Sequence, residues 1–174
     1  MSNWSNFYKD RIKNSYVNYV KYRYQPFIDI LMSVNCFTFR EEGCGVSTIS
    51  KILKEFGVKN IDMFDFDFDQ VVLSQLNLKS DIPHIGNILK KQDEVNCIFS
   101  HGVLEHFNDN DIVKILSRQK AESKCVIHYV PTNKYESQSF GDERLLDIEY
   151  WKKLVNPSKT ITFNNEKDLI MLFK

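Results

Sequence analysis

Apolar residues along the chain alternate between two patterns. Short continuous apolar runs bounded by polar or turn residues are typical of buried strands, and they cover 36–41, 58–66, 82–86, 95–100 and 124–130. Apolar positions three or four residues apart predict amphipathic helices, and they cover 46–56, 69–78, 108–120 and 145–155. We therefore expect strands and helices to alternate through most of the sequence.

The two ends of the sequence depart from this alternation. Residues 8–34 predict helix, with Pro26 starting a second helix that ends near Val34. The helical spacing there is carried by Ile12, Tyr16, Tyr19 and Val20. The last two apolar runs, 159–163 and 168–173, have no helix between them and predict an antiparallel hairpin.

Together these elements predict the fold class. Strands that alternate with helices form a parallel sheet with helices on both faces, so we expect a doubly wound, Rossmann-like α/β fold. Its sheet is mostly parallel, with an antiparallel C-terminal hairpin at the edge. We expect an N-terminal helical segment over 1–34, a candidate lid, and one α/β domain over 35–174.

Composition narrows the class of protein. The chain has 174 residues with 23 basic and 23 acidic side chains, so its net charge does not indicate a polyanionic partner. The four cysteines form no C-x-x-C pair and predict reduced, buried thiols and no metal site: Cys36, Cys44, Cys97 and Cys125. Neither a signal peptide nor a membrane span is recognisable, so we expect a soluble cytoplasmic protein.

Two acids and two glycines meet at the junction between the first strand and its helix. Glu41 ends the strand, Glu42 follows it, and Gly43 and Gly45 form the turn. Glycines allow close approach of a ligand to the backbone, and a helix N-terminus presents unpaired N–H groups. In a doubly wound sheet, ligands bind beyond the carboxyl ends of the strands, which is where this turn is expected.

The pattern Glu41-x-Gly43-x-Gly45 resembles the first motif of class I S-adenosylmethionine-dependent methyltransferases. The resemblance implies that the turn, with Cys44, holds the methionine portion of the cofactor and that Glu41 faces its amino or sulfonium end. Glu42 stands where the family is usually apolar, and we expect it to face solvent. Ser47 replaces a glycine common in the motif, which is tolerable if Ser47 caps the helix or donates locally.

Two later stretches extend this resemblance. Asp65 follows Gly45 by 20 residues, where the family's acidic residue accepts hydrogen bonds from the ribose hydroxyls, and Phe66 is expected in the same site. The nearby alternatives to Asp65 are Asp62, Asp67 and Asp69. A carboxylate suits vicinal hydroxyls because it has two acceptor oxygens. The stretch "HIGNILK" resembles the third motif and implies that Asn87 meets the adenine amino group with Ile88 beside the ring.

The stretch "VNCIFSHGVLEHF", residues 95–107, is similar to the fourth strand and turn of many small-molecule methyltransferases. The resemblance implies that Ser100 contacts the cofactor and that His101 faces the transferred methyl group. A histidine there is either a general base or a residue that only lines the pocket. Glu105 and His106 resemble a structural turn of the family, although His106 is also a substrate candidate. His128, inside a buried strand, is expected to be a core histidine.

Candidate substrate contacts come from two segments. Tyr8, Arg11 and Tyr19 lie in the N-terminal helical segment, as a lid or simply as helix packing. Tyr135 and Arg144 lie in the long loop after the fifth strand, where Arg144 could instead pair with Asp142 or Glu143.

The sequence thus predicts a methyltransferase that uses S-adenosylmethionine, releases S-adenosylhomocysteine, and methylates an oxygen or nitrogen of a small molecule. A nucleic-acid substrate is one alternative, which the basic N-terminal segment favours and the zero net charge disfavours. The other is a cofactor-binding protein without catalysis, because Ser47, Asn87 and Asn96 all depart from the family pattern.

Overall fold

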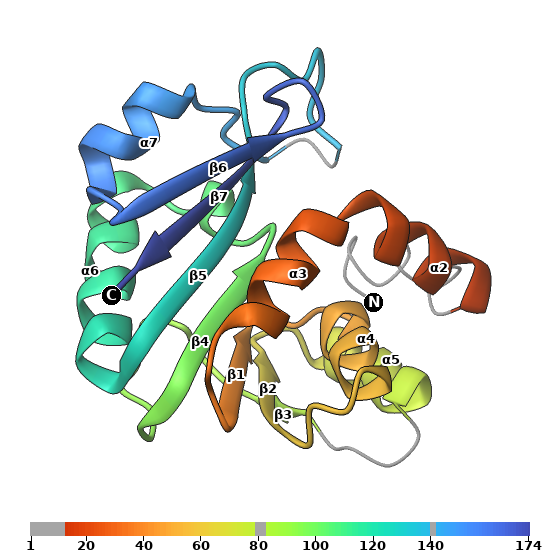
Figure 1. Ribbon diagram of the computed structural model, residues 1–174. Coiled ribbons are helices and arrows are strands. Elements are labelled where there is room, and N and C mark those ends of the chain that lie inside the picture. Colours follow the sequence, from red (N-terminus) through yellow and green to blue (C-terminus); the bar gives the residue numbers. More distant parts are fainter. Residues whose placement is uncertain (1–12, 79–82, 140–141) are drawn as a thin grey trace. The chain divides into compact units, whose positions relative to one another are not determined.

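The computed structural model describes residues 13–78, 83–139 and 142–174 (Figure 1). The chain forms two compact units, residues 1–88 and residues 89–174, and each is described by itself. In the parts of the chain that the structure describes, no helix has the length and apolar character that crossing a membrane requires.

The first unit is a small parallel sheet with helices between its strands. The order of its strands is β3-β2-β1, and all three run parallel. The elements in chain order are α2 (Asn14–Arg23), α3 (Gln25–Ser33), β1 (Thr38–Glu42), α4 (Thr48–Glu55), β2 (Asn60–Asp65), α5 (Phe68–Leu78) and β3 (His84–Ile85).

Helices α2 and α3 pack on each other and on α4 within this unit. The buried side of α2 is formed by Val17 and Val20, whereas Tyr19 is exposed and Tyr22 is 86% exposed. The prediction that Tyr19 belongs to the packed helical face is therefore wrong. Valine is wholly apolar, whereas tyrosine keeps a hydroxyl that favours a wet environment, so the helix turns its valines inward.

The second unit combines a parallel strand pair with an antiparallel hairpin. Its strand order is β4-β5-β7-β6, in which β4 and β5 run parallel and β7 runs antiparallel to both of its neighbours. Its elements are β4 (Val95–His101), the 3-10 helix η1 (Leu104–His106), α6 (Asp109–Glu122), β5 (Ser123–Pro131), α7 (Ile148–Val155), β6 (Lys159–Phe163) and β7 (Asp168–Phe173).

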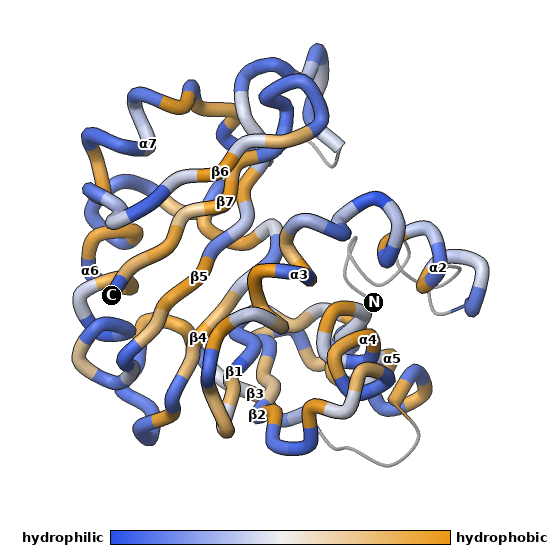
Figure 2. Tube along the Cα trace, in the orientation of Figure 1, coloured by the Kyte–Doolittle hydropathy of each residue, from blue (hydrophilic) through white to orange (hydrophobic). Residues whose placement is uncertain are grey.

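The core of the second unit lies along its central strands. Every residue of β7 is buried, and Figure 2 shows β5 and β7 coloured as hydrophobic over much of their length. Helix α6 packs on β5, and its N-terminus is capped by Asn108, whose side chain accepts from the Asp111 N–H. Asp147 caps α7 in the same way through the Tyr150 N–H.

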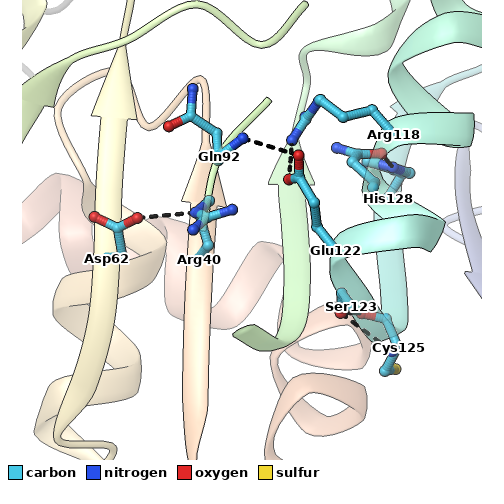
Figure 3. A network of polar contacts seen from close by, with 9 residues as sticks. Arg40, Asp62, Gln92, Arg118, Glu122, Ser123, Cys125 and His128 are labelled. Carbon is cyan, nitrogen blue, oxygen red and sulfur yellow. Dashed lines mark hydrogen bonds and ion pairs between the residues drawn. The ribbon is translucent and has the colours of Figure 1, made fainter. Parts of the chain in front are cut away.

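Each unit also contains a tightly held ion pair, drawn in Figure 3. In the first unit, Arg40 of β1 is buried and donates to Asp62 of β2 over 2.8 Å. In the second, Glu122 at the end of α6 accepts from Arg118 and, over 2.8 Å, from the backbone N–H of Gln92. The first pair joins β1 to β2, and Glu122 joins the end of α6 to the backbone at Gln92.

The predicted fold class is confirmed: the seven strands are mostly parallel, with an antiparallel C-terminal hairpin, in a doubly wound, Rossmann-like fold. Predicted strands and helices match the observed ones within a few residues, and the two hairpin strands have the predicted bounds. The division into 1–34 and 35–174 stays a prediction. All four cysteines are thiols, but Cys36 is half-buried, so the expectation of four buried thiols is wrong for that residue.

Candidate cofactor site

In the turn between β1 and α4, every second residue has a left-handed backbone conformation. Gly43, Gly45 and Ser47 have φ values of 70°, 52° and 54°. Glycine adopts such angles without steric cost, which explains the two glycines at this point. The sequence 43–47 therefore makes a sharp turn that leads directly into the first residue of α4.

Hydrogen bonds to β2 hold this turn in place. The N–H groups of Gly43 and Cys44 both donate to the Phe64 carbonyl, each over 3.0 Å. The N–H of Gly45 donates to Oδ2 of Asp65 over 2.8 Å, and Oδ1 of the same carboxylate accepts from the Asp67 N–H over 2.9 Å. Burial raises the pKa of Asp65, against the lowering effect of these backbone bonds. Asp65 thus ties together the ends of two strands.

Glu41 and Glu42 lie side by side on β1 and are both buried. Glu41 accepts from the hydroxyl and the N–H of Ser50, over 2.5 and 3.3 Å, and burial raises its pKa to about 8. Its carboxyl group thereby links β1 to α4. Glu42 is 0% exposed, so the expectation that it faces solvent is wrong. In a parallel sheet both faces are covered, and neighbouring residues of a strand are buried on opposite faces.

Ser47 occupies the N-cap position of α4 without capping it. Its hydroxyl bonds instead to the Ser74 hydroxyl of α5, over 2.5 Å. The expectation that Ser47 caps the helix or donates locally is therefore wrong, because its partner lies 27 residues away. The left-handed angle of Ser47 also gives a physical reason for the glycine that the resembling motif has here. Cys44, beside it in the turn, is buried, and burial raises its pKa.

The structure brings the third predicted segment to the same edge of the first unit. The Gly86 N–H donates to the Asp65 carbonyl over 2.9 Å, so residues 86–88 follow directly from this contact. A Cβ at position 86 would lie 2.7 Å from the Phe64 ring, so only glycine fits. Ile88 is buried, Asn87 is exposed, and the Phe66 ring is 74% exposed.

Two residues of this region carry no signal in the sequence motifs. Gln70 of α5 and Thr48 of α4 are buried, and among the described residues their side-chain polar atoms have no hydrogen-bond partner. Helical spacing assigns both to packed helices, so motif comparison alone could not single them out.

In the second unit, Ser100 belongs to a buried hydrogen-bonded chain. Its hydroxyl bonds to Nδ1 of His128 over 2.7 Å, and Nε2 of His128 bonds to Oε1 of Gln119 over 2.9 Å. Burial lowers the pKa of His128 to about 3, so its ring is neutral. The prediction of a core histidine is confirmed. The Ser100 side chain faces this histidine, and its role toward a cofactor stays a prediction.

His101 ends β4 beside a group of tyrosines. Its ring stacks on that of Tyr129, with centroids 4.4 Å apart and planes 16° apart. The hydroxyls of Tyr129 and Tyr135 both donate to Oδ1 of the buried Asp168, over 2.8 and 2.7 Å. The arrangement fixes the plane of His101, and it gives Tyr135 a partner inside the protein.

The loop that carries the remaining candidates is fastened to η1 and α6. Arg144 donates to the Phe107 carbonyl over 2.6 Å and to Asp109 over 2.7 Å, so its expected pairing with Asp142 or Glu143 is wrong. Asp142 lies 2.9 Å from Nδ1 of His106 instead. Glu105 is buried beside Glu143 and Asp142; burial raises its pKa to about 8, and these carboxylates add to the effect.

Of the substrate candidates in the N-terminal segment, Tyr8 and Arg11 lie outside the described residues, and Tyr19 is exposed on α2. Within the described ranges, no three histidine, cysteine or carboxylate side chains are grouped so that they could hold a metal ion.

The fold and this turn define a class. The chain has the class I S-adenosylmethionine-dependent methyltransferase-like fold. It is similar to an S-adenosylmethionine-dependent methyltransferase from Clostridium acetobutylicum ATCC 824, with a TM-score of 0.71 and 11% identity over 91% of this chain and 97% of that one.

Two further solved structures agree. The magnesium protoporphyrin IX methyltransferase of Synechocystis PCC 6803 with bound SAH has a TM-score of 0.69 and 10% identity, over 87% of this chain and 81% of that one. An O-methyltransferase family protein from Burkholderia thailandensis has a TM-score of 0.67 and 9% identity, over 91% and 58%. The sequence matches no protein-family model and no curated protein. At these identities the similarity establishes the fold alone.

Proposed function

We propose that the protein is an S-adenosylmethionine-dependent methyltransferase that methylates an oxygen or nitrogen of a small molecule and releases S-adenosylhomocysteine. The observation that carries the proposal is the contact between the glycine turn and Asp65. One carboxylate oxygen accepts from Gly45 and the other from Asp67, so a buried acid is held at the turn where two strands end. Each oxygen retains a second lone pair for a hydroxyl donor.

The residues present fit a nucleoside ligand with a charged tail. Asp65 accepts from the ribose hydroxyls, and the bare backbone of Gly43 and Gly45 allows close approach of the ligand. The exposed Phe66 ring and the Asn87 side chain provide an apolar face and a polar edge for adenine, with Ile88 behind them. The bound cofactor supplies the electrophilic methyl group, while the protein's task is to orient the acceptor.

His101 is the proposed residue at the acceptor. Its ring is held by stacking on Tyr129, so its nitrogens keep a fixed direction. A neutral imidazole so oriented takes a proton from a hydroxyl or ammonium acceptor, which is the work required of a general base.

A small-molecule acceptor is favoured over nucleic acid by the charge balance of 23 basic and 23 acidic side chains. The names of similar structures do not decide between the two, since they include a magnesium protoporphyrin IX methyltransferase and the methyltransferase domain of bacterial CtHen1.

The test is calorimetric titration of the protein with S-adenosylmethionine and S-adenosylhomocysteine. We expect binding of both ligands, and roughly a tenfold to hundredfold loss of affinity in Asp65→Asn, because hydrogen bonds to a charged acceptor contribute about 1.5–3 kcal/mol each. Asp67→Asn is the matched control. It removes a charge two residues away while its side-chain oxygen can still accept from the N–H groups of Asp69 and Gln70.

Absence of binding by the folded wild-type protein would overturn the proposed function. Equal losses in Asp65→Asn and Asp67→Asn would overturn the role of Asp65. Binding without turnover of any hydroxyl or amine acceptor would favour the alternative of a cofactor-binding protein that lacks catalysis.

A further inference from the structure

Gln70 differs from its neighbours on the buried face of α5. Ser74 bonds to Ser47, and Asn77 bonds to the Val46 carbonyl over 2.7 Å and to Lys51 over 2.9 Å. Gln70, one turn before Ser74, is 3% exposed, yet neither Nε2 nor Oε1 has a hydrogen-bond partner among the described residues. The buried face of α5 thus has three polar side chains beside Val71, and of these three Gln70 has no hydrogen-bond partner within the described part of the chain.

An unpartnered buried amide destabilises a protein, because its donors and acceptors lose water and gain nothing in return. A methionine of similar shape would have no such penalty at this position. The sequence nevertheless has glutamine there, so we look for a partner that the chain itself does not supply.

The side-chain amide of Gln70 lies close to Gly45 of the glycine turn. Among the described residues, and apart from its two chain neighbours, a Cβ built on Gly45 would meet Oε1 of Gln70 alone within 4 Å, at 3.8 Å. The space that a side chain at position 45 would fill is thus bounded by the amide of Gln70. A ligand that approaches the bare backbone of Gly45 comes within reach of that amide.

A second buried polar group without a hydrogen-bond partner in the described ranges lies directly after the glycine turn. Thr48, the first residue of α4, is buried, and its Oγ1 has no partner within the described part of the chain. The first turn of α4 contains no acidic residue of its own, and the Glu41 carboxyl group of β1 already accepts from the Ser50 N–H there. A hydroxyl and a helix N-terminus together favour a carboxylate.

We propose that the Gln70 amide and the Thr48 hydroxyl bind the amino-acid end of the cofactor. This inference rests on the proposed function and deepens it. The amide can donate to a carboxylate and accept from an ammonium group, and the hydroxyl can donate to the carboxylate. Neither residue belongs to the motifs that carry the resemblance, so their assignment comes from burial and missing partners alone.

The test compares two ligands on Gln70→Met. S-Adenosylhomocysteine has the amino-acid end, whereas 5′-methylthioadenosine has the same nucleoside and sulfur without it. We expect Gln70→Met to lose at least tenfold in affinity for S-adenosylhomocysteine and less than twofold for methylthioadenosine. We also expect the melting temperature of the ligand-free protein to rise, since the substitution removes an unsatisfied buried amide. Thr48→Val should show the same pair of changes on a smaller scale.

Gln119→Met is the matched control, because it makes the same substitution at a buried glutamine that has a partner, His128. It should lower the melting temperature and leave both affinities unchanged. Retention of wild-type affinity for S-adenosylhomocysteine in Gln70→Met would overturn the inference, as would an equal loss for both ligands. Failure of the wild-type protein to bind either ligand would instead overturn the proposed function itself.

Discussion

The glycine turn of the first unit and the loop of residues 132–147 in the second satisfy their polar groups in different ways. In the turn, Gln70 and Thr48 are buried with polar atoms that no described residue meets. In the loop, the candidate side chains are engaged with other residues: Tyr135 donates to Asp168, and Arg144 donates to Asp109. Both regions had been predicted to contact a ligand.

The glycine turn therefore has polar groups available for a ligand, whereas the candidate side chains of the loop are already hydrogen-bonded within the protein. A ligand at the turn would gain hydrogen bonds that the protein does not otherwise make, whereas a ligand at Tyr135 or Arg144 would first have to break existing ones. We therefore expect the turn to determine cofactor affinity, and the bonds of the loop to contribute mainly to stability.

The largest expected effect is on the pH dependence of stability, and it compares two buried acids, one in each unit. The pKa values of Glu41 and Glu105 are both about 8 in the folded protein, well above the ordinary 4.5. The folded state then binds more protons between pH 4.5 and 8, so wild-type stability falls as the pH rises through that range, by up to about 5 kcal/mol for each acid. Glu41→Gln or Glu105→Gln should remove the part of this fall in stability that comes from the substituted acid.

Urea unfolding at pH 5.5 and pH 8.5 measures this effect. The advantage of each glutamine variant over wild type should grow with pH, and an advantage that shrinks would contradict it. Glu143→Gln should weaken the pH dependence that comes from Glu105, whose pKa Glu143 raises, and leave that of Glu41 intact.

The next effect concerns the bonds that fasten the loop. Asp168→Leu leaves the buried hydroxyl of Tyr129 and that of Tyr135 without their acceptor, and we expect the free energy of unfolding to fall by about 3 kcal/mol. Tyr135→Phe removes only one of the two bonds and should reduce it by about 1 kcal/mol. Denaturant titration of both variants measures these two losses in the free energy of unfolding. Equal losses would show that the two phenols do not depend on this carboxylate as the structure indicates.

The smallest effect concerns the strain in the turn. Ser47→Gly relieves a left-handed serine but removes the bond to Ser74, and these contributions of about 1 kcal/mol each should nearly cancel. Ser47→Ala keeps the strain and loses the bond, so it should destabilise by about 1–2 kcal/mol. The two melting temperatures provide the comparison, and a glycine variant no more stable than the alanine variant would argue against strain at this position.

Much of the fold was predictable from sequence because it is expressed in local patterns. Continuous apolar runs gave the buried strands, and residues 159–163 and 168–173 matched the observed hairpin strands. Asp65 was expected near the end of the second strand and lies there, but its bond to the Gly45 N–H was not predicted.

The parts that could not be predicted depend on partners distant in sequence. Arg144 and Asp109 are 35 residues apart, and no local pattern distinguishes Asp109 from the nearer acids. Burial of Glu42 follows from coverage of both sheet faces, which a single charged residue in a sequence does not reveal. Gln70 is a candidate ligand contact because its buried amide has no hydrogen-bond partner among the described residues, and only the three-dimensional structure reveals this.

The strand order of the second unit has a consequence for synthesis on the ribosome. Strand β7 follows β6 in the chain but lies between β5 and β6 in the sheet. While β7 is still inside the exit tunnel, β5 has no partner on one side, and β6 has no place to pair. The three strands of the first unit pair with one another using only residues up to 88. The nascent chain should therefore pass through a stage in which the glycine turn is already formed while an apolar strand edge is exposed, which is when a chaperone would be needed most.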